Sequence, residues 1–466
     1  MQNANGRGYK LALVAYLSLS YRKCEIPCPL SSGPVRDTGG ACPSAGNTQC
    51  REEVVRCHDI MRAGRWPPHG RQPPGGRDAP RDASRTAGPA AASGDGTATA
   101  GQGVPRVRDH RVDALRGVAL LMMCIDHIPQ DVLNRFTMRN VGFADAAEVF
   151  VLLAGYASWL AYGRAFSRQP WQAVVERIVR RCGRLYVFQT LMAVVTIVTI
   201  RVWRHYWPVP VDFLEPELAH GLDSLWRVML LQALPGNLNI LPLYIVLLLA
   251  FAPLCWVLRR VGPWPVLVAS GALWAVVNFD PSLNFPNWLD PDGWYFDPLA
   301  WQFLFVIGAC ASILAARHGG SLPLSRPLVV ACGAYLVFSA VESFPWTGWG
   351  LPDMRPMATP WTDKMVLSPL RLLDVLCLFY LVQSSTLATR LSLGRAGQLM
   401  AMFGRHSLEV FTLGTIIDLY GRLVFTNFGV GWGMQVTINV VGFIMLWGMT
   451  RELDRRRTLA RAARRA

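Results

Sequence analysis

Arg116 and His127 stand at the two ends of one apolar run, with ten residues between them. On an α-helix this spacing places both side chains on one face, roughly 16 Å apart at about 1.5 Å of rise per residue. A guanidinium can hold a phosphate through two parallel hydrogen bonds, and a neutral imidazole can accept a hydroxyl proton near physiological pH. The pair predicts an anion-binding helix start and a proton-accepting helix end. Pro129 is expected to loosen the helix just past His127.

Further ionisable residues lie within apolar segments, where charges are costly and tend to mark function. Asp126 or Glu148 could raise the basicity of His127 by bonding its other ring nitrogen. Because adjacent helical residues do not face each other, Asp126 could instead pair across helices. Arg371 and Asp374 are three residues apart and are expected to pair on one helix face. The remaining candidates of this kind are His406, Glu409 and Asp418.

Helices that cross a lipid bilayer are needed to position these residues. The chain of 466 residues is 52% hydrophobic and contains 17 Trp, a composition common in proteins that cross a membrane several times. Ten spanning segments are expected, at 115–133, 147–163, 185–203, 237–258, 264–278, 299–316, 327–343, 367–388, 406–425 and 432–450. The predicted fold class is all-α, a polytopic integral membrane protein of about ten transmembrane helices. Residues 222–235 are amphipathic and are expected at the interface.

Positive charge is distributed unevenly between the joints that connect these segments. Arginines gather in 164–184, at 259–260, in 317–326, in 390–395 and after 450, whereas the intervening joints carry many of the acids. The positive-inside rule therefore places both termini in the cytoplasm. This pattern also accounts for the formal net charge of +15, so a nucleic-acid partner is not predicted.

The predicted outer side collects several tryptophans, including Trp288, Trp294 and Trp301. One interpretation is an aromatic belt at the membrane interface. The other is a platform for the apolar faces of sugars, because these rings offer a large and rigid contact area.

The N-terminal residues 1–105 differ from the rest of the chain, since they are rich in Gly, Pro, Ala, Arg and Ser. They are predicted to be a disordered cytoplasmic tail, or the result of a start codon assigned too early. The membrane domain is expected at 106–452, followed by a basic cytoplasmic tail at 453–466. Cys24 and Cys28 with His58 lack the paired spacing of a zinc site, so no metal is predicted.

Several motifs together carry a resemblance to a known family. The arginine–histidine spacing resembles the signature of the acyltransferase-3 superfamily of membrane acyltransferases, and its context resembles the OpgC family over about residues 108–450. The matching stretches are Arg111–Gly117, Asp126–Pro129, Asn140–Val151, Ala154–Tyr156, Asn239–Ile245, Asp297–Gln302 and Gly404–Phe411. Ala154-Gly155-Tyr156 stands where the superfamily often has Ser-Gly-Phe.

The resemblance implies a ten-span protein of the bacterial inner membrane that transfers an acyl group to a periplasmic glycan. The donor would be a cytoplasmic acyl-coenzyme A, expected to be succinyl-coenzyme A, and the acceptor an osmoregulated glucan. No permanently bound cofactor is expected. The implied catalytic residues are His127, Asp126 and Glu148, and the implied substrate-binding residues are Arg116, Arg405, Arg371 and Trp301.

Within this interpretation His127 acts either as a general base or through a transient acyl-histidine. Arg116, aided by Arg405, would bind a coenzyme A phosphate. Arg371 would meet the free carboxylate of a succinyl group only if Asp374 does not occupy it. A transporter or flippase for a glycan or an acylated glycan is the alternative, because buried charges and a broken helix also suit transport. A structural or sensing membrane protein without catalysis is a third hypothesis.

Overall fold

A computed structural model describes residues 109–208, 222–235, 238–357 and 361–463. The predicted N-terminal tail lies outside the described residues. Within the described part the protein is helical, and the one β-type pairing is an isolated bridge between Asn287 and Asp290. The all-α prediction is therefore confirmed.

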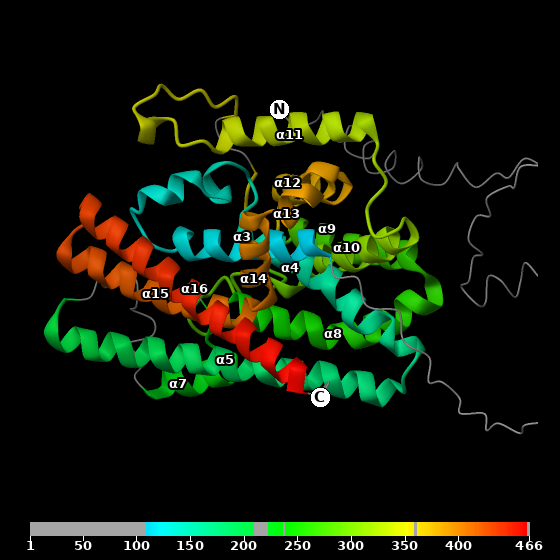
Figure 1. The fold of residues 1–466 in the computed structure, drawn as a ribbon, viewed down its shortest axis with the longest axis horizontal. Coiled ribbons are helices and arrows are strands. Elements are labelled where there is room, and N and C mark those ends of the chain that lie inside the picture. The colour runs from blue at the N-terminus through cyan, green and yellow to red at the C-terminus, as the bar shows by residue number, and fades with distance from the viewer. Residues whose placement is uncertain (1–108, 209–221, 236–237, 358–360, 464–466) are drawn as a thin grey trace, which may run out of the picture. The chain divides into compact units, whose positions relative to one another are not determined.

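Ten helices overlap the ten predicted apolar segments, although the first predicted segment, 115–133, runs seven residues past the end of its helix (Figure 1). They are α3 (His110–Asp126), α4 (Ala146–Ser158), α5 (Trp171–Tyr206), α8 (Ile240–Val261), α9 (Pro263–Phe279), α10 (Pro298–Arg317), α11 (Arg326–Ser343), α12 (Pro369–Ser384), α15 (Ser407–Phe428) and α16 (Trp432–Ala463). Among the described residues, three shorter α-helices join them: α7 (Leu222–Met229), α13 (Thr386–Leu393) and α14 (Arg395–Arg405). The segment predicted to be amphipathic thus contains α7.

Six of these helices are long and apolar enough to cross a membrane, namely α4 with its continuation to Ser167, α5, α8, α10, α11 and α16. The bent pair α12 and α13, which turns by 77°, would make a seventh. The helices α3 and α9 have only 17 residues each, and α15 carries Glu409, Asp418 and Arg422, which lower its mean hydropathy. Several long apolar helices therefore indicate a membrane protein, while the predicted count of ten exceeds what length and composition alone support.

Local sequence explains where the helices around α3 begin and end. The Asp109 side chain accepts a hydrogen bond from the Arg111 backbone N–H and caps α3. That helix ends at Asp126, just before Pro129, as predicted. The next long helix, α4, begins with a capping box in which Asp145 and Glu148 bond each other's backbone.

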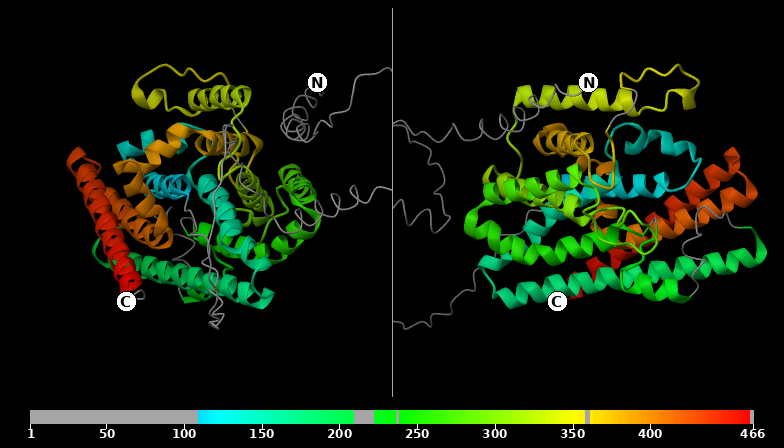
Figure 2. Two further views of the ribbon diagram at one scale, coloured as in Figure 1. Left: turned by 45° about the vertical axis from the view of Figure 1, so that its right-hand side comes forward. Right: turned by 180° about the vertical axis from the view of Figure 1, so that it is seen from behind.

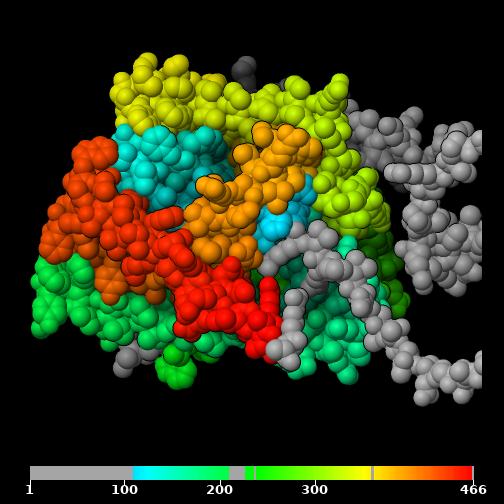
Figure 3. All heavy atoms as spheres, viewed as in Figure 1, coloured from blue at the N-terminus to red at the C-terminus, as the bar shows by residue number. Residues whose placement is uncertain are grey.

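α3 packs against α4, α14 and α15, and α4 packs against α10. In Figures 1 and 2, α11 lies along one side of this group and α5 along the opposite side. Figure 3 shows α12, α13 and α14 filling the surface between α11 and α16. The helices α3 and α4 thus lie between α11 and α5.

Glycines permit two very close helix crossings in this group. A Cβ on Gly404 of α14 would lie 1.9 Å from the Asp113 carbonyl oxygen of α3, and one on Gly117 would meet Met400 equally closely. A Cβ on Gly155 of α4 would lie 2.0 Å from the Phe305 carbonyl oxygen of α10. Small residues of this kind let helix backbones approach in membrane proteins.

Contacts between helix ends show that α10 and α12 run antiparallel to α3. At one end of the helices, Arg111 donates to the Gly320 and Gln383 carbonyls, which lie just after α10 and near the end of α12. Arg405 contacts Asp454 of α16 at the same end. We call this the arginine end, because the predicted Arg-rich joints meet there. The opposite end holds the end of α3 and the starts of α4 and α12, where Glu148 meets Arg371.

Candidate active site

His127 caps the end of α3, and its ring is held by its own helix. Its Nδ1 lies 2.5 Å from the Met123 carbonyl oxygen. Because a carbonyl can only accept a hydrogen bond, Nδ1 must carry the proton. In the neutral ring, Nε2 is then the unprotonated nitrogen and is available as a base.

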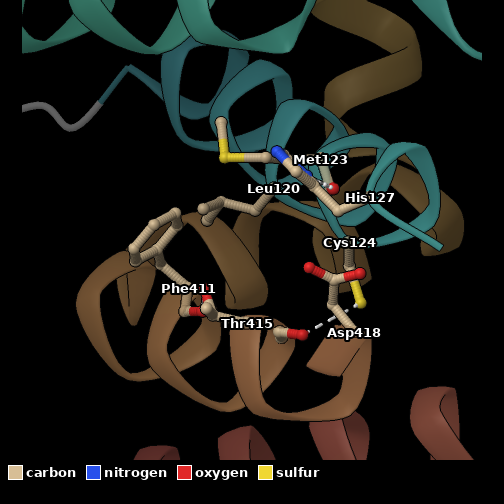
Figure 4. A pocket seen from close by; sticks show the side chains of 8 residues that line it. Leu120, Met123, Cys124, His127, Phe411, Thr415 and Asp418 are labelled. Carbon is tan, nitrogen blue, oxygen red and sulfur yellow. Dashed lines mark hydrogen bonds between the residues drawn. The ribbon is translucent and has the colours of Figure 1, made fainter. Parts of the chain in front are cut away.

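His127 lines a small cavity between α3 and α15 (Figure 4). The cavity has a volume of about 20 Å³, which is room for about one water molecule or one hydroxyl group. Its lining residues are Leu120, Met123, Cys124, His127, Phe411, Gly414, Thr415 and Asp418. The wall is thus mainly apolar, with a few polar groups gathered beside the histidine.

Two charged residues of α15 meet the end of α3 at this cavity. Arg422 donates a hydrogen bond of 2.9 Å from Nη2 to the His127 carbonyl oxygen. Asp418 is buried, and in Figure 4 its carboxylate points toward α3. From the sequence, Asp418 was expected only as a charge in an apolar segment, and Arg422 was not predicted. The spacing of Asp418 and Arg422, four residues apart within an apolar helix, could have identified the pair from the sequence.

Asp126 does not contact the His127 ring. Its carboxylate accepts a hydrogen bond from the Thr137 hydroxyl, in the loop that follows α3. The side-chain amide of Asn134 in the same loop lies 3.5 Å from the Asp126 carbonyl oxygen. Asp126 therefore ties the loop 128–145 to the end of α3, and the predicted orienting bond to His127 is not formed.

Glu148 belongs to a cluster of four charged side chains at the start of α4. Arg371 donates to Glu148 at 2.7 Å from Nε, and its Nη2 lies 2.6 Å from the same oxygen. Asp145 accepts a hydrogen bond from Lys364, and Arg371 Nη2 lies 3.4 Å from it. Two cations thus balance two carboxylates, and Glu148 faces Arg371 instead of His127.

The predicted pairing of Arg371 with Asp374 is replaced by this cluster. Asp374 instead accepts a hydrogen bond of 3.1 Å from the Ala144 backbone N–H. The sequence rule considered only neighbours on the same helix, whereas the partners of Arg371 come from α4. Arg371 is therefore already bound to carboxylates of the protein, and a succinyl carboxylate would have to compete with Glu148.

Trp301 does not lie on a surface where it could serve as the predicted sugar platform. Its side chain is fully buried and packs edge-on against Phe296. The indole Nε1 donates to the Lys364 and Met365 carbonyl oxygens, at 3.1 and 3.0 Å. Trp301 therefore holds the segment that carries Lys364. Because Lys364 lies in a polar connection, the sequence pattern gave no sign of its role.

The histidine cavity and the charge cluster lie at the same end of the helices. The charges of Asp145 and Lys364 act electrostatically on both Asp126 and His127. The end of α3, the start of α4 and the Lys364 segment thus form one polar region beside His127.

Arg116 and Arg405 both lie next to the glycine crossing of α3 and α14, toward the arginine end. Arg116 is half-buried and donates to the Leu153 carbonyl oxygen of α4 at 2.9 Å. Arg405 lies 3.0 Å from Asp454 of α16, which also contacts the buried His406 at 3.2 Å. The two arginines occupy neighbouring positions, while their side chains bind different helices.

No group of three His, Cys, Asp or Glu side chains able to hold a metal ion occurs among the described residues.

Comparison with known families identifies the chain. The family model described as OpgC protein matches residues 108–458, so the chain belongs to the OpgC family. No curated protein matches the chain significantly. The family match indicates a glucan-modifying, acyltransferase-like role.

Proposed function

We propose that this OpgC-family protein transfers an acyl group, succinyl in our proposal, from cytoplasmic acyl-coenzyme A to a hydroxyl of a periplasmic glycan. The acceptor would be an osmoregulated glucan, and the protein would act in the bacterial inner membrane. Family membership supports the general class of reaction. The side chains described above support the particular chemistry.

The observation that carries the proposal is the protonation pattern of His127. Its Nδ1–H is occupied by the Met123 carbonyl, which leaves Nε2 as a base beside a cavity. An apolar membrane bundle has little structural reason to keep a basic nitrogen at a helix end. A positioned general base of this type contributes about 10²–10⁴-fold to the rate of a proton-transfer step.

The proposed reaction needs a single proton carrier. The glycan hydroxyl oxygen attacks the thioester carbonyl carbon while its proton moves to Nε2 of His127. The C–S bond then breaks, and the imidazolium returns the proton to the leaving thiolate. The products are the glycan ester and free coenzyme A, and the histidine ends as it began.

The donor would enter from the arginine end. Arg116 lies on α3 roughly 16 Å from His127 at about 1.5 Å per residue, and Arg405 lies beside it across the glycine crossing. A phosphate bound there would replace the Leu153 carbonyl or the Asp454 carboxylate as an arginine partner. The thioester arm would then extend along α3 toward the cavity.

The proposed topology has ten spans with both termini in the cytoplasm. The directions of α4, α10 and α12, opposite to α3, and the gathering of arginines at one end support it. The short helix α3 would then end part-way through the bilayer, because α15 continues from Arg422 to Phe428 beyond the contact with His127. The glycan would reach His127 from the opposite side, through the polar region beside it.

A donor assay tests this function. Purified protein in liposomes is supplied with labelled succinyl-coenzyme A and an unlabelled glucan, and label in the glucan is measured. We expect transfer from succinyl-coenzyme A to exceed transfer from acetyl-coenzyme A. A protein that moves the glucan across the bilayer without labelling it would be a transporter, and the proposal would be wrong.

A further inference from the structure

We propose that Arg422 and Asp418 of α15 form a positioning pair that holds His127 at the end of α3 during turnover. This inference rests on the acyl-transfer role proposed above. The two residues lie on α15 and do not belong to the arginine–histidine motif of α3.

Arg422 fixes the backbone of His127. The last carbonyls of a helix have no partners within the helix, and a cation placed there is favoured by the helix dipole. Arg422 supplies both a cation and a hydrogen bond of 2.9 Å to the His127 carbonyl oxygen. With Nδ1 bound to Met123 as well, the residue is held at its backbone and at its ring.

Asp418 is placed to hold Arg422 in turn. The two residues are four apart on α15, with the acid toward the N-terminus, which is the favourable order for an ion pair on a helix. Their opposite charges attract each other. Because Asp418 is only 2% exposed, water screens this attraction little.

Asp418 also shares the cavity with His127. Of the eight residues described as lining the cavity, Asp418 is the one carboxylate, beside the Thr415 hydroxyl and the Cys124 thiol. Thr415 donates its hydroxyl hydrogen to the Phe411 carbonyl, so its oxygen can face the cavity only as an acceptor. Asp418 therefore holds Arg422 from a position in the wall of the His127 cavity.

The charge cluster at the start of α4 does not take over this task. Asp145 acts on His127 from that side, but Lys364 acts with it and has the opposite sign. Asp145 is bonded to Lys364, so the two effects offset each other. The contact that holds His127 therefore comes from Arg422, which also acts on the ring as a cation, so the pair positions His127 without stabilising its positive charge.

Four variants test the pair in the liposome assay: Asp418→Asn, Arg422→Ala, Arg422→Lys and the control Thr426→Val. Thr426 lies one turn beyond Arg422, is exposed and donates only to the Arg422 backbone carbonyl. We expect Asp418→Asn and Arg422→Ala to lower kcat about 10–10²-fold, because a misplaced reacting group costs that much. The KM for acyl-coenzyme A should stay within about twofold, since neither residue lies at the arginine end. Arg422→Lys should recover part of the loss, and Thr426→Val should match the wild type.

Wild-type kcat in both Asp418→Asn and Arg422→Ala, in preparations where His127→Ala is inactive, would overturn the inference. A rise of about 10–10²-fold in the KM for acyl-coenzyme A, with unchanged kcat, would also overturn the inference. If Arg422→Ala fails to fold by its thermal transition, the isosteric Asp418→Asn decides alone. A wild-type protein that transfers no acyl group refutes the proposed function instead, so the two failures are distinguishable.

Discussion

Replacing His127 by Asn separates the base from the structural role of this side chain. An Asn amide can still donate to the Met123 carbonyl, as Nδ1 does, but it has no nitrogen that accepts a proton. His127→Ala removes both functions. The comparison of the two variants therefore isolates the contribution of Nε2.

The expected magnitudes follow from these contacts. Loss of the base should lower kcat by about 10²–10⁴, which is roughly 3–5 kcal/mol in the activation free energy. The lost bond to Met123 should cost about 0.5–1.5 kcal/mol of stability in His127→Ala, and little in His127→Asn. The Ala variant also enlarges a cavity of about 20 Å³ at a partly buried site, so unfolding is not expected.

The assay measures label transfer and donor binding separately, together with the thermal transition of each variant in detergent. Both variants should bind acyl-coenzyme A like the wild type and fail to transfer. If His127→Asn keeps more than about a tenth of the wild-type kcat, Nε2 is not the base and the reasoning from the tautomer is wrong.

Three further predictions concern the two ends of the molecule. Arg116→Ala should raise the Kd for acyl-coenzyme A about tenfold or more with a smaller effect on kcat, and Arg116→Lys should restore it only partly, because the planar fork is lost; unchanged binding in titration calorimetry would contradict this. Gly404→Ala should lower the melting temperature by the equivalent of at least about 1–3 kcal/mol, because its Cβ would lie 1.9 Å from a backbone oxygen, while Gly448→Ala, which has open space, should be neutral or slightly stabilising. In whole cells, an impermeant thiol reagent should label a cysteine placed at exposed Ser282 but not one at exposed Ser167, and the reverse result would invert the topology.

The sequence predicts the positions of the helices well, but it predicts the partners of the charged side chains poorly. Apolar runs define helices through local periodicity, so each of the ten predicted segments overlaps a helix, and Pro129 indicated the end of α3 more closely than the predicted bound at 133 did. The partners of the charged residues come from other segments of the chain, and Arg371 and Glu148 are more than two hundred positions apart. A rule for neighbours on one helix selected Asp374 instead. The burial of Trp301 was equally hidden, because a predicted outer position does not tell which way the ring points.

The site depends on α3 being fixed at both ends. At the arginine end, the crossing with α14 is so close that a single methyl group would not fit, which sets the height of Arg116 in the bundle. At the other end, Arg422 binds the carbonyl of His127, so the helix cannot slide along α15 without breaking that bond. A phosphate held at one end and a base held at the other are then separated by a constant length of helix. The distance between Arg116 and His127 is useful for acyl transfer only if α3 does not move, so the rigid attachment of this helix makes their spacing functional.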